Sequence, residues 1–153
     1  MAYTNSDNLF GITQYIVDPV AKYGSFQTVQ SAIDAAYAAG GGYVAVRKGN
    51  YIENLTFRAG VQIGGVGVDG RLTDGVVIAG NHTFSDTGGT VGYFLAENIH
   101  FIASPGGTCI TLSPVPVGQL CVLALKFCGV FSDTGKSIVC GTSTGDCVIR
   151  AVQ

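Results

Sequence analysis

A short strand-like motif returns at intervals of about 22 to 26 residues through the chain beyond residue 42. Within each copy, apolar and polar residues alternate, as they do when successive side chains of a strand point to opposite faces. A repeat that holds only short strands cannot bury its own apolar face, so its copies must stack and share one core. The sequence therefore predicts a β-solenoid. The copies that we align begin at Asn54, Val76, Asn98, Ala124 and Val148.

The aligned copies also predict an aromatic ladder inside the stack, formed by Phe57, Phe101 and Phe127. The competing architecture is a sandwich of antiparallel strands. Its tight hairpins would favour Asn-Gly or Asp-Gly pairs, and only Asp69-Gly70 and Asp74-Gly75 fit that pattern. We therefore expect a mainly β chain whose strands run parallel.

Residues 25–39 show a helical pattern. Apolar residues at three- and four-residue spacing follow Ser25, which suits an N-cap, and Gly40-Gly41-Gly42 ends the run. We expect one amphipathic helix that caps the strand edges of the first coil. Residues 1–24 should form an irregular lead-in with one short strand at 14–17, and 25–153 a single β-helix domain whose coils span 43–153.

The composition favours assembly. Charged residues make up only 12% of the chain and apolar residues 47%, which is too apolar for a disordered chain and leaves a small monomer poorly covered by charge. The last residues, 150–153, fall in the middle of an expected coil, so another chain, a further domain or self-association should cover that edge. The expected partner is a second copy, as in a homo-oligomer such as a trimer, or another structural subunit.

The charge pattern disfavours nucleic acid as a partner, because the net charge is −2 and the longest basic run is Arg47-Lys48. No stretch approaches the roughly 18 apolar residues of a membrane span, so no membrane partner is expected. The first residues show no export signal, and the sequence assigns no location. The glycines of segment 65–70 have a nucleotide-loop spacing but precede a strand rather than a helix, so no cofactor is expected.

Four segments together resemble one known superfamily. They are Gly24-Ser-Phe-Gln-Thr-Val-Gln-Ser-Ala-Ile-Asp-Ala-Ala36, Gly42-Tyr-Val-Ala-Val46, Gly49-Asn-Tyr-Ile-Glu-Asn-Leu-Thr-Phe57 and Val61-Gln-Ile-Gly-Gly65. Over about residues 17–67 the chain is similar to the opening of pectin-lyase-like proteins, which include pectinesterases and phage or viral tailspike and fibre proteins. The resemblance implies a right-handed parallel β-helix with an N-terminal capping α-helix. It says little about activity, because the functional residues of these families lie in later coils.

The sequence offers no set of catalytic residues or metal ligands. Neither the paired aspartates of the esterases nor the calcium-binding carboxylates of the lyases, which the resemblance would imply, can be placed on it. An enzymatic activity stays open, and a non-enzyme is favoured. His82, Ser85 and Asp86 have the residue types of a hydrolytic triad but lie too close together in sequence to form one. The five cysteines are expected to be buried free thiols.

Two groups of residues are candidate binding sites. Three charged residues of one glycine-rich loop could hold a calcium ion or a sugar hydroxyl, although charges in a solvated turn are the ordinary finding: Asp69, Arg71 and Asp74. Four residues at outward positions of the coils could contact a polysaccharide: Tyr93, His100, Lys126 and Arg150. We expect Lys126 and Arg150 to align in successive coils, where they could grip an acidic sugar chain.

Two functions remain open at this point. The first is a structural or attachment module like those of phage fibres, virion-associated if the source is viral, with uncharged faces that pack in a homo-oligomer. The second is a polysaccharide-binding or polysaccharide-degrading β-helix of the pectinesterase or pectate-lyase kind, or the N-terminal part of such an enzyme. The low charge favours the first.

Overall fold

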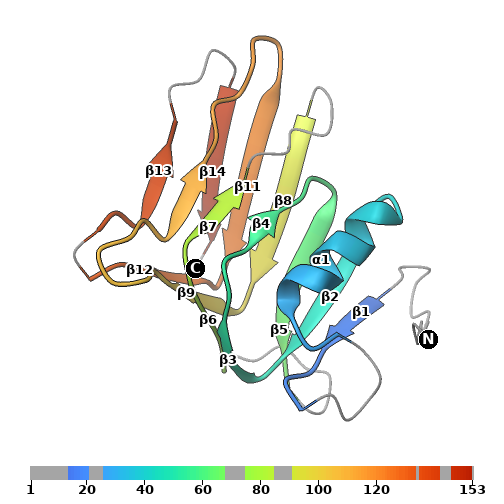
Figure 1. Ribbon diagram of the computed structural model, residues 1–153. Coiled ribbons are helices and arrows are strands. Elements are labelled where there is room, and N and C mark those ends of the chain that lie inside the picture. Colours follow the sequence, from blue (N-terminus) through green and yellow to red (C-terminus); the bar gives the residue numbers. More distant parts are fainter. Residues whose placement is uncertain are drawn as a thin grey trace.

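The computed structural model describes residues 14–20, 26–67, 75–84, 91–133, 135–141 and 146–152. Within these ranges the chain forms one helix and fourteen strands, and the strands that pair do so in parallel (Figure 1). The fold is therefore mainly β with parallel sheets, as the sequence predicted.

The strands build three sheets. Sheet A contains, in spatial order, β1 (Gln14–Val17), β2 (Gly42–Arg47), β5 (Val61–Val66), β8 (Val91–Glu97), β11 (Leu120–Lys126) and β14 (Asp146–Val152). Sheet B contains β3 (Gly49–Ile52), β6 (Val76–Ala79), β9 (Ile99–Ile102) and β12 (Gly129–Phe131). Sheet C contains β4 (Thr56–Phe57), β7 (His82–Phe84), β10 (Ile110–Leu112) and β13 (Ile138–Cys140).

From β2 onward the chain visits the three sheets in a fixed order, A then B then C, and then begins a new round. Each strand pairs with the strands of the same sheet from neighbouring rounds, as β6 pairs with β3 and β9. Stacking of this kind lets rounds that are too small to fold alone share one interior. The arrangement is consistent with a β-solenoid.

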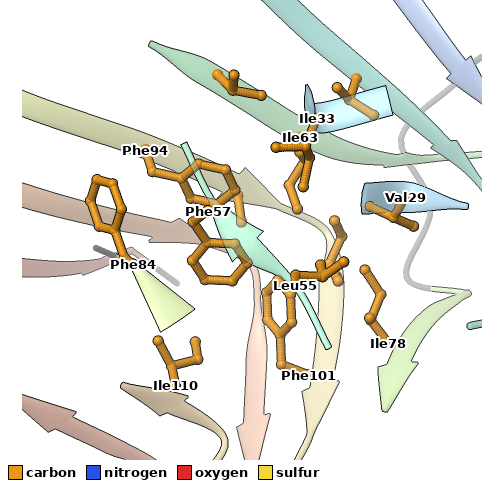
Figure 2. Packing of buried hydrophobic residues seen from close by; sticks show 14 of the residues in the cluster. Val29, Ile33, Leu55, Phe57, Ile63, Ile78, Phe84, Phe94, Phe101 and Ile110 are labelled. Atoms are coloured by element: carbon orange, nitrogen blue, oxygen red, sulfur yellow. The ribbon is translucent and has the colours of Figure 1, made fainter. Parts of the chain in front are cut away.

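The shared interior is apolar and aromatic at its centre, where Figure 2 shows Phe57 between residues of the other sheets. Phe57 of sheet C stacks on Phe94 of sheet A with ring centroids 4.2 Å apart, and it meets Phe101 of sheet B edge-on at 5.8 Å. All three side chains are fully buried. Burial of one such ring contributes about 1.5–3 kcal/mol, so this contact is a main reason that the three sheets close on one core.

The helix α1 (Val29–Ala38) covers one end of the stack (Figure 1). Its buried face packs on β1, β2 and β5, as predicted for a capping helix, and consists of Val29, Ala32, Ile33 and Ala36. The N-cap is Thr28, whose hydroxyl accepts a hydrogen bond from the Ser31 N–H. The prediction of Ser25 as N-cap was wrong, because the first helical turn begins later; Ser25 itself lies outside the described residues.

Two side chains join the helix to the strands that follow it. The carboxylate of Glu53 accepts hydrogen bonds from the N–H groups of Val29 and Gln30, at 2.9 and 3.0 Å, which places a negative charge at the positive end of the helix. The side-chain amide of Gln30 accepts from the Thr56 N–H at 2.7 Å and donates to the Thr56 carbonyl at 3.3 Å. The helix therefore supplies hydrogen-bond partners for the backbone N–H and carbonyl of Thr56, at the edge of β4, which is the first strand of sheet C.

The alignment of the repeat was wrong in register. The copies that begin at Val76 and Asn98 lie on β6 and β9 of sheet B, whereas the other three lie on strands of sheets C and A. The connecting loops differ in length, so the sequence distance between register partners changes from round to round. Strand-like runs from different sheets therefore fell into the same column of the alignment.

The predicted aromatic ladder is wrong. Phe57 and Phe101 lie on different sheets, C and B, and meet edge-on instead of stacking in register, and Phe127 does not enter the core. This residue forms the turn between β11 and β12 with φ 52°, and its side chain is 51% exposed. Asn98 forms the matching turn between β8 and β9 with φ 54°. The turn requires a residue with left-handed backbone conformation, and Phe127 is that residue. Its side chain therefore does not point into the core.

Candidate functional site

The outer face of sheet A carries both apolar and charged residues along three neighbouring strands. Burial alternates along β8 and β11, because successive side chains point into the core and away from it. On the outside, Val122 pairs in register with Tyr93 and Val148, and Val91 pairs with Leu120. Val91 is 56% exposed. We call the apolar outward residues of β8, β11 and β14 the apolar patch of sheet A: Val91, Tyr93, Leu95, Leu120, Val122, Ala124 and Val148. Two charged positions of β14 pair in register with members of this patch, Asp146 with Leu120 and Arg150 with Ala124.

A polar group borders this patch. The carboxylate of Glu97 accepts a hydrogen bond from the Tyr43 hydroxyl at 3.3 Å and lies 3.5 Å from the Lys126 ammonium. Burial, and then the neighbouring Glu97 charge, raise the pKa of Tyr43, so its hydroxyl stays protonated and can donate. The Tyr43 side chain reaches Glu97 across Gly64, where any Cβ would overlap the hydroxyl. Glu97 is thus held by two partners.

Three of the four predicted polysaccharide contacts share this outer face. Tyr93, Lys126 and Arg150 lie on β8, β11 and β14. Arg150 pairs in register with Ala124, so it is a diagonal neighbour of Lys126 rather than directly aligned with it, which corrects the predicted alignment. His100 lies on sheet B and is therefore not brought together with the other three.

The outer face of sheet B carries a row of apolar side chains, one from each strand. Ile52 is 91% exposed, Phe131 53% and Ile102 39%. Together with Ala79 they are consecutive register partners on β3, β6, β9 and β12. We call this row the apolar stripe of sheet B: Ile52, Ala79, Ile102 and Phe131.

The row beside the stripe holds Asn50, Val77, His100 and Gly129 and contains no charged carboxylate or amine. The rings of His100 and Phe131 lie 6.1 Å apart, and both occupy the space that a side chain at position 129 would need. Local sequence pattern did not predict β3, β7 or β12. The stripe was missed with β3 and β12, each of which begins at a glycine. The two-residue alternation of Tyr51 and Ile52 was the signal that could have located β3.

His82 is a polar group inside the core, where the sequence predicted a loop residue. It is fully buried, and its Nδ1 accepts a hydrogen bond from the Leu55 N–H at 3.2 Å. Its ring stacks on Phe57 at 5.8 Å and meets Phe101 edge-on at 5.2 Å, while Nε2 has no hydrogen-bond partner. Burial lowers the pKa of His82 to about 4 against a weaker opposing effect of the Ile78 carbonyl.

The cysteines only partly follow the prediction of buried thiols. Cys109 and Cys121 are buried, and burial raises the pKa of Cys109 to about 11. Cys128 is half-buried, with its thiol against the Ala96 carbonyl at 3.3 Å, and Cys140 is exposed. Both lie near the last round of strands, where fewer residues cover them.

The predicted loop site of Asp69, Arg71 and Asp74 lies outside the described residues, as do Ser85 and Asp86. In the part of the chain that the structure describes, no three His, Cys, Asp or Glu side chains gather as a metal site requires. Within the same ranges, no helix has the length and apolar character to cross a bilayer. What the described outer faces offer is two groups of apolar residues, and the group on sheet A lies among the charged positions Lys126, Asp146 and Arg150.

In comparisons with known proteins, no family model, no curated protein and no solved structure matches the chain.

Proposed function

We propose that the chain is a structural or attachment module, built as a right-handed parallel β-helix and assembled as a homo-oligomer. The fixed order of the three sheets supports the β-helix. Right-handedness is supported by the general rule that connections between parallel strands of one sheet are right-handed in about 98% of cases. The resemblance of residues 17–67 to pectin-lyase-like proteins supports the kinship with phage and viral fibres.

The observation that carries the proposal is the apolar character of the outer faces. Outward side chains are not needed for the core, and water favours polar residues there. The apolar patch of sheet A nevertheless joins seven such residues on three neighbouring strands. Contiguous exposed apolar patches usually mark contacts with another macromolecule. A homo-oligomer covers this surface without requiring any catalytic group.

Light scattering on a size-exclusion column across a dilution series tests the proposal. We expect one discrete mass that is a multiple of the mass of a single copy. On dilution this mass should fall towards that of one copy as the contacts between copies dissociate. The mass of a single copy at every concentration would overturn self-assembly. A mass that grows without limit would indicate aggregation instead of a defined module.

A second candidate function is binding of an acidic polysaccharide. Its support is the diagonal pair of Lys126 and Arg150 on neighbouring strands, with Tyr93 on the same face. Glu97 neutralises part of the Lys126 charge, which weakens this support. Titration with polygalacturonate should give saturable binding that the double variant K126A/R150A loses and the exposed control K136A keeps. Equal binding by both variants would refute the site.

A further inference from the structure

We propose that two copies of the chain bind end to end, through the strand edges that lie farthest from the capping helix. The outermost strand of sheet A, β14, then pairs antiparallel with β14 of the second copy around a two-fold axis at Val148. This inference rests on the proposed self-assembly and names its contact. A two-fold contact uses the same surface of both copies, so the assembly closes as a dimer.

The last round of strands has edges that no described strand covers. β14, β12 and β13 are the outermost strands of sheets A, B and C, and they lie at the end of the stack opposite α1 (Figure 1). Among the described strands, each of the three pairs with a single neighbour, on one edge. The other edge presents backbone N–H and carbonyl groups to which a strand of another chain can pair.

The core is open at the same end. Ile149 of β14 is 40% exposed, whereas Leu123, its register partner on β11, is fully buried. In sheet C, Ile138 is only partly buried, whereas its register partner Ile110 is fully buried. A partner that adds a further layer of strands would therefore cover apolar core residues together with the backbone edges.

The backbone of β14 restricts how a second β14 can pair with it. The Val152 carbonyl accepts a hydrogen bond from the Phe127 N–H, so residue 152, and every second residue back to 146, directs its backbone groups at β11. Residues 147, 149 and 151 therefore direct theirs at the free edge. In an antiparallel pair, residues of this kind must lie opposite one another to exchange hydrogen bonds. An axis at residue 148 meets this condition, because it places residue 147 opposite residue 149 of the second copy.

The charges of β14 favour this register. Asp146 and Arg150 are about 13 Å apart along the strand, too far to pair with each other, and their register partners on β11 are uncharged. With the axis at Val148, Asp146 of each copy lies opposite Arg150 of the other, so the dimer gains two cross-strand pairs of opposite charge. An axis at residue 149, which the backbone also allows, would place each charge opposite a valine. The strand β14 is thus complementary to itself in one register.

The same rotation brings the other two sheets together. A two-fold axis through sheet A exchanges the positions of sheets B and C, so β12 of one copy lies along β13 of the other and runs antiparallel to it. A rise of ~3.3 Å per residue and a sheet thickness of ~10 Å give the three strand edges an area of about 430 Å² in each copy. A total of roughly 900 Å² is at the low end for specific complexes, so we expect a dimer that dissociates on dilution.

Charge reversals on β14 test the contact. R150D leaves two negative positions on the strand and D146R two positive ones, so each variant alone brings like charges together in the dimer. By analytical ultracentrifugation over a concentration series, we expect the dimer of either variant to have a dissociation constant at least roughly tenfold above that of the wild type. An equimolar mixture of the two variants restores opposite charges at both pairs and should form a mixed dimer with nearly wild-type affinity. The control K48D makes the same change of charge at an exposed residue of the first round and should dimerise like the wild type.

The other outcomes overturn the contact, and they separate it from the proposed function. If either single variant keeps the wild-type affinity, another surface carries the self-assembly. Two weakened variants that do not recover on mixing contradict the proposed register. A wild type with an odd number of copies excludes a two-fold contact, and a monomeric wild type at every concentration refutes the self-assembly itself. Far-ultraviolet circular dichroism checks that every variant is folded.

Discussion

Acidification is expected to destabilise this fold through His82, which lies in the core between Phe57 and Phe101. No charged side chain contributes to its lowered pKa, and a second proton would have to go to Nδ1, which already accepts the Leu55 N–H. The folded chain therefore holds the neutral imidazole. In the unfolded chain the ring is surrounded by water and takes up a proton near its ordinary pKa of 6.5.

The sign follows from this difference. Between pH 6.5 and about 4 the unfolded chain binds more protons than the folded chain, so the free energy of unfolding falls as the pH falls. The contribution of the neutral His82 ring to the free energy of unfolding is fully present well above pH 6.5. The gap between the two pKa values corresponds to a total loss of roughly 3 kcal/mol, of which roughly 1–2 kcal/mol is lost by about pH 5.5. That is a large part of the stability of an ordinary domain.

Urea unfolding followed by far-ultraviolet circular dichroism measures the effect at a series of pH values between about 7.5 and 5.5, above the range in which ordinary carboxylates titrate. The protein concentration is held constant, because self-association shifts apparent stability. We expect the free energy of unfolding to fall by roughly 1–2 kcal/mol over this range.

Two variants separate His82 from other causes. H82N keeps a hydrogen-bond acceptor near the position of Nδ1 but does not titrate; it should be less stable at every pH, because of the cavity, and should lose the slope. H100N removes the other histidine of the chain and should keep the slope. A wild-type slope in H82N would refute the assignment. A ring-proton signal of His82 that titrates near 6.5 in the folded protein would do so independently.

Three further predictions concern single contacts. F127N should raise the free energy of unfolding by about 1 kcal/mol, because a bulky residue is strained in the left-handed conformation that Asn98 already adopts at the matching turn. N98F should lower the free energy of unfolding. Equal urea midpoints of the variants and the wild type would contradict this strain. E53A should lower the free energy of unfolding by about 1–2 kcal/mol, because the helix loses the carboxylate that accepts from its first N–H groups. E53Q should give an intermediate value in the same urea titration. An E53A variant as stable as the wild type would contradict the role of Glu53 as a helix cap. G64A should destabilise by about 1–3 kcal/mol, because its methyl group displaces the Tyr43 hydroxyl. Y43F removes that hydroxyl, so the double variant should lose less than the sum of the two single changes, and simple additivity would be the contrary result.

Local pattern was sufficient to predict most strands and the helix. Strands 14–17 and 76–79 have the predicted bounds, and the helix at 29–38 lies within the predicted 25–39. These segments are long or strongly patterned enough for their own residues to decide the structure. The strands β3 and β12, by contrast, start at glycines and hold only one or two large apolar residues, so their strand form depends on pairing with neighbouring rounds.

Register and packing could not be predicted in the same way. An interval confined to about 22 to 26 residues was the wrong assumption, because each corner between sheets can lengthen without disturbing the core. That freedom is why Phe127 was placed in the ladder, and why Lys126 and Arg150 were aligned directly. The burial of His82 was equally hidden, since a polar residue between Asn81 and Thr83 looks like part of a loop until β7 pairs with β4 and β10.

The three outer faces allow a comparison within one molecule. Inward positions form the core and are apolar apart from His82, so their apolar character is explained by folding and carries no information about function. Outward positions are free of that requirement. On sheet C three of the four register partners in one outward row are threonines, Thr56, Thr83 and Thr111, and the fourth is Val139. Sheet B instead has the apolar stripe. On sheet A one row is apolar across β8, β11 and β14, namely Tyr93, Val122 and Val148, and the other rows include charged residues. The fold does not require apolar residues at these outward positions, so sheets A and B, and not sheet C, are where the proposed self-assembly is to be tested by substitution.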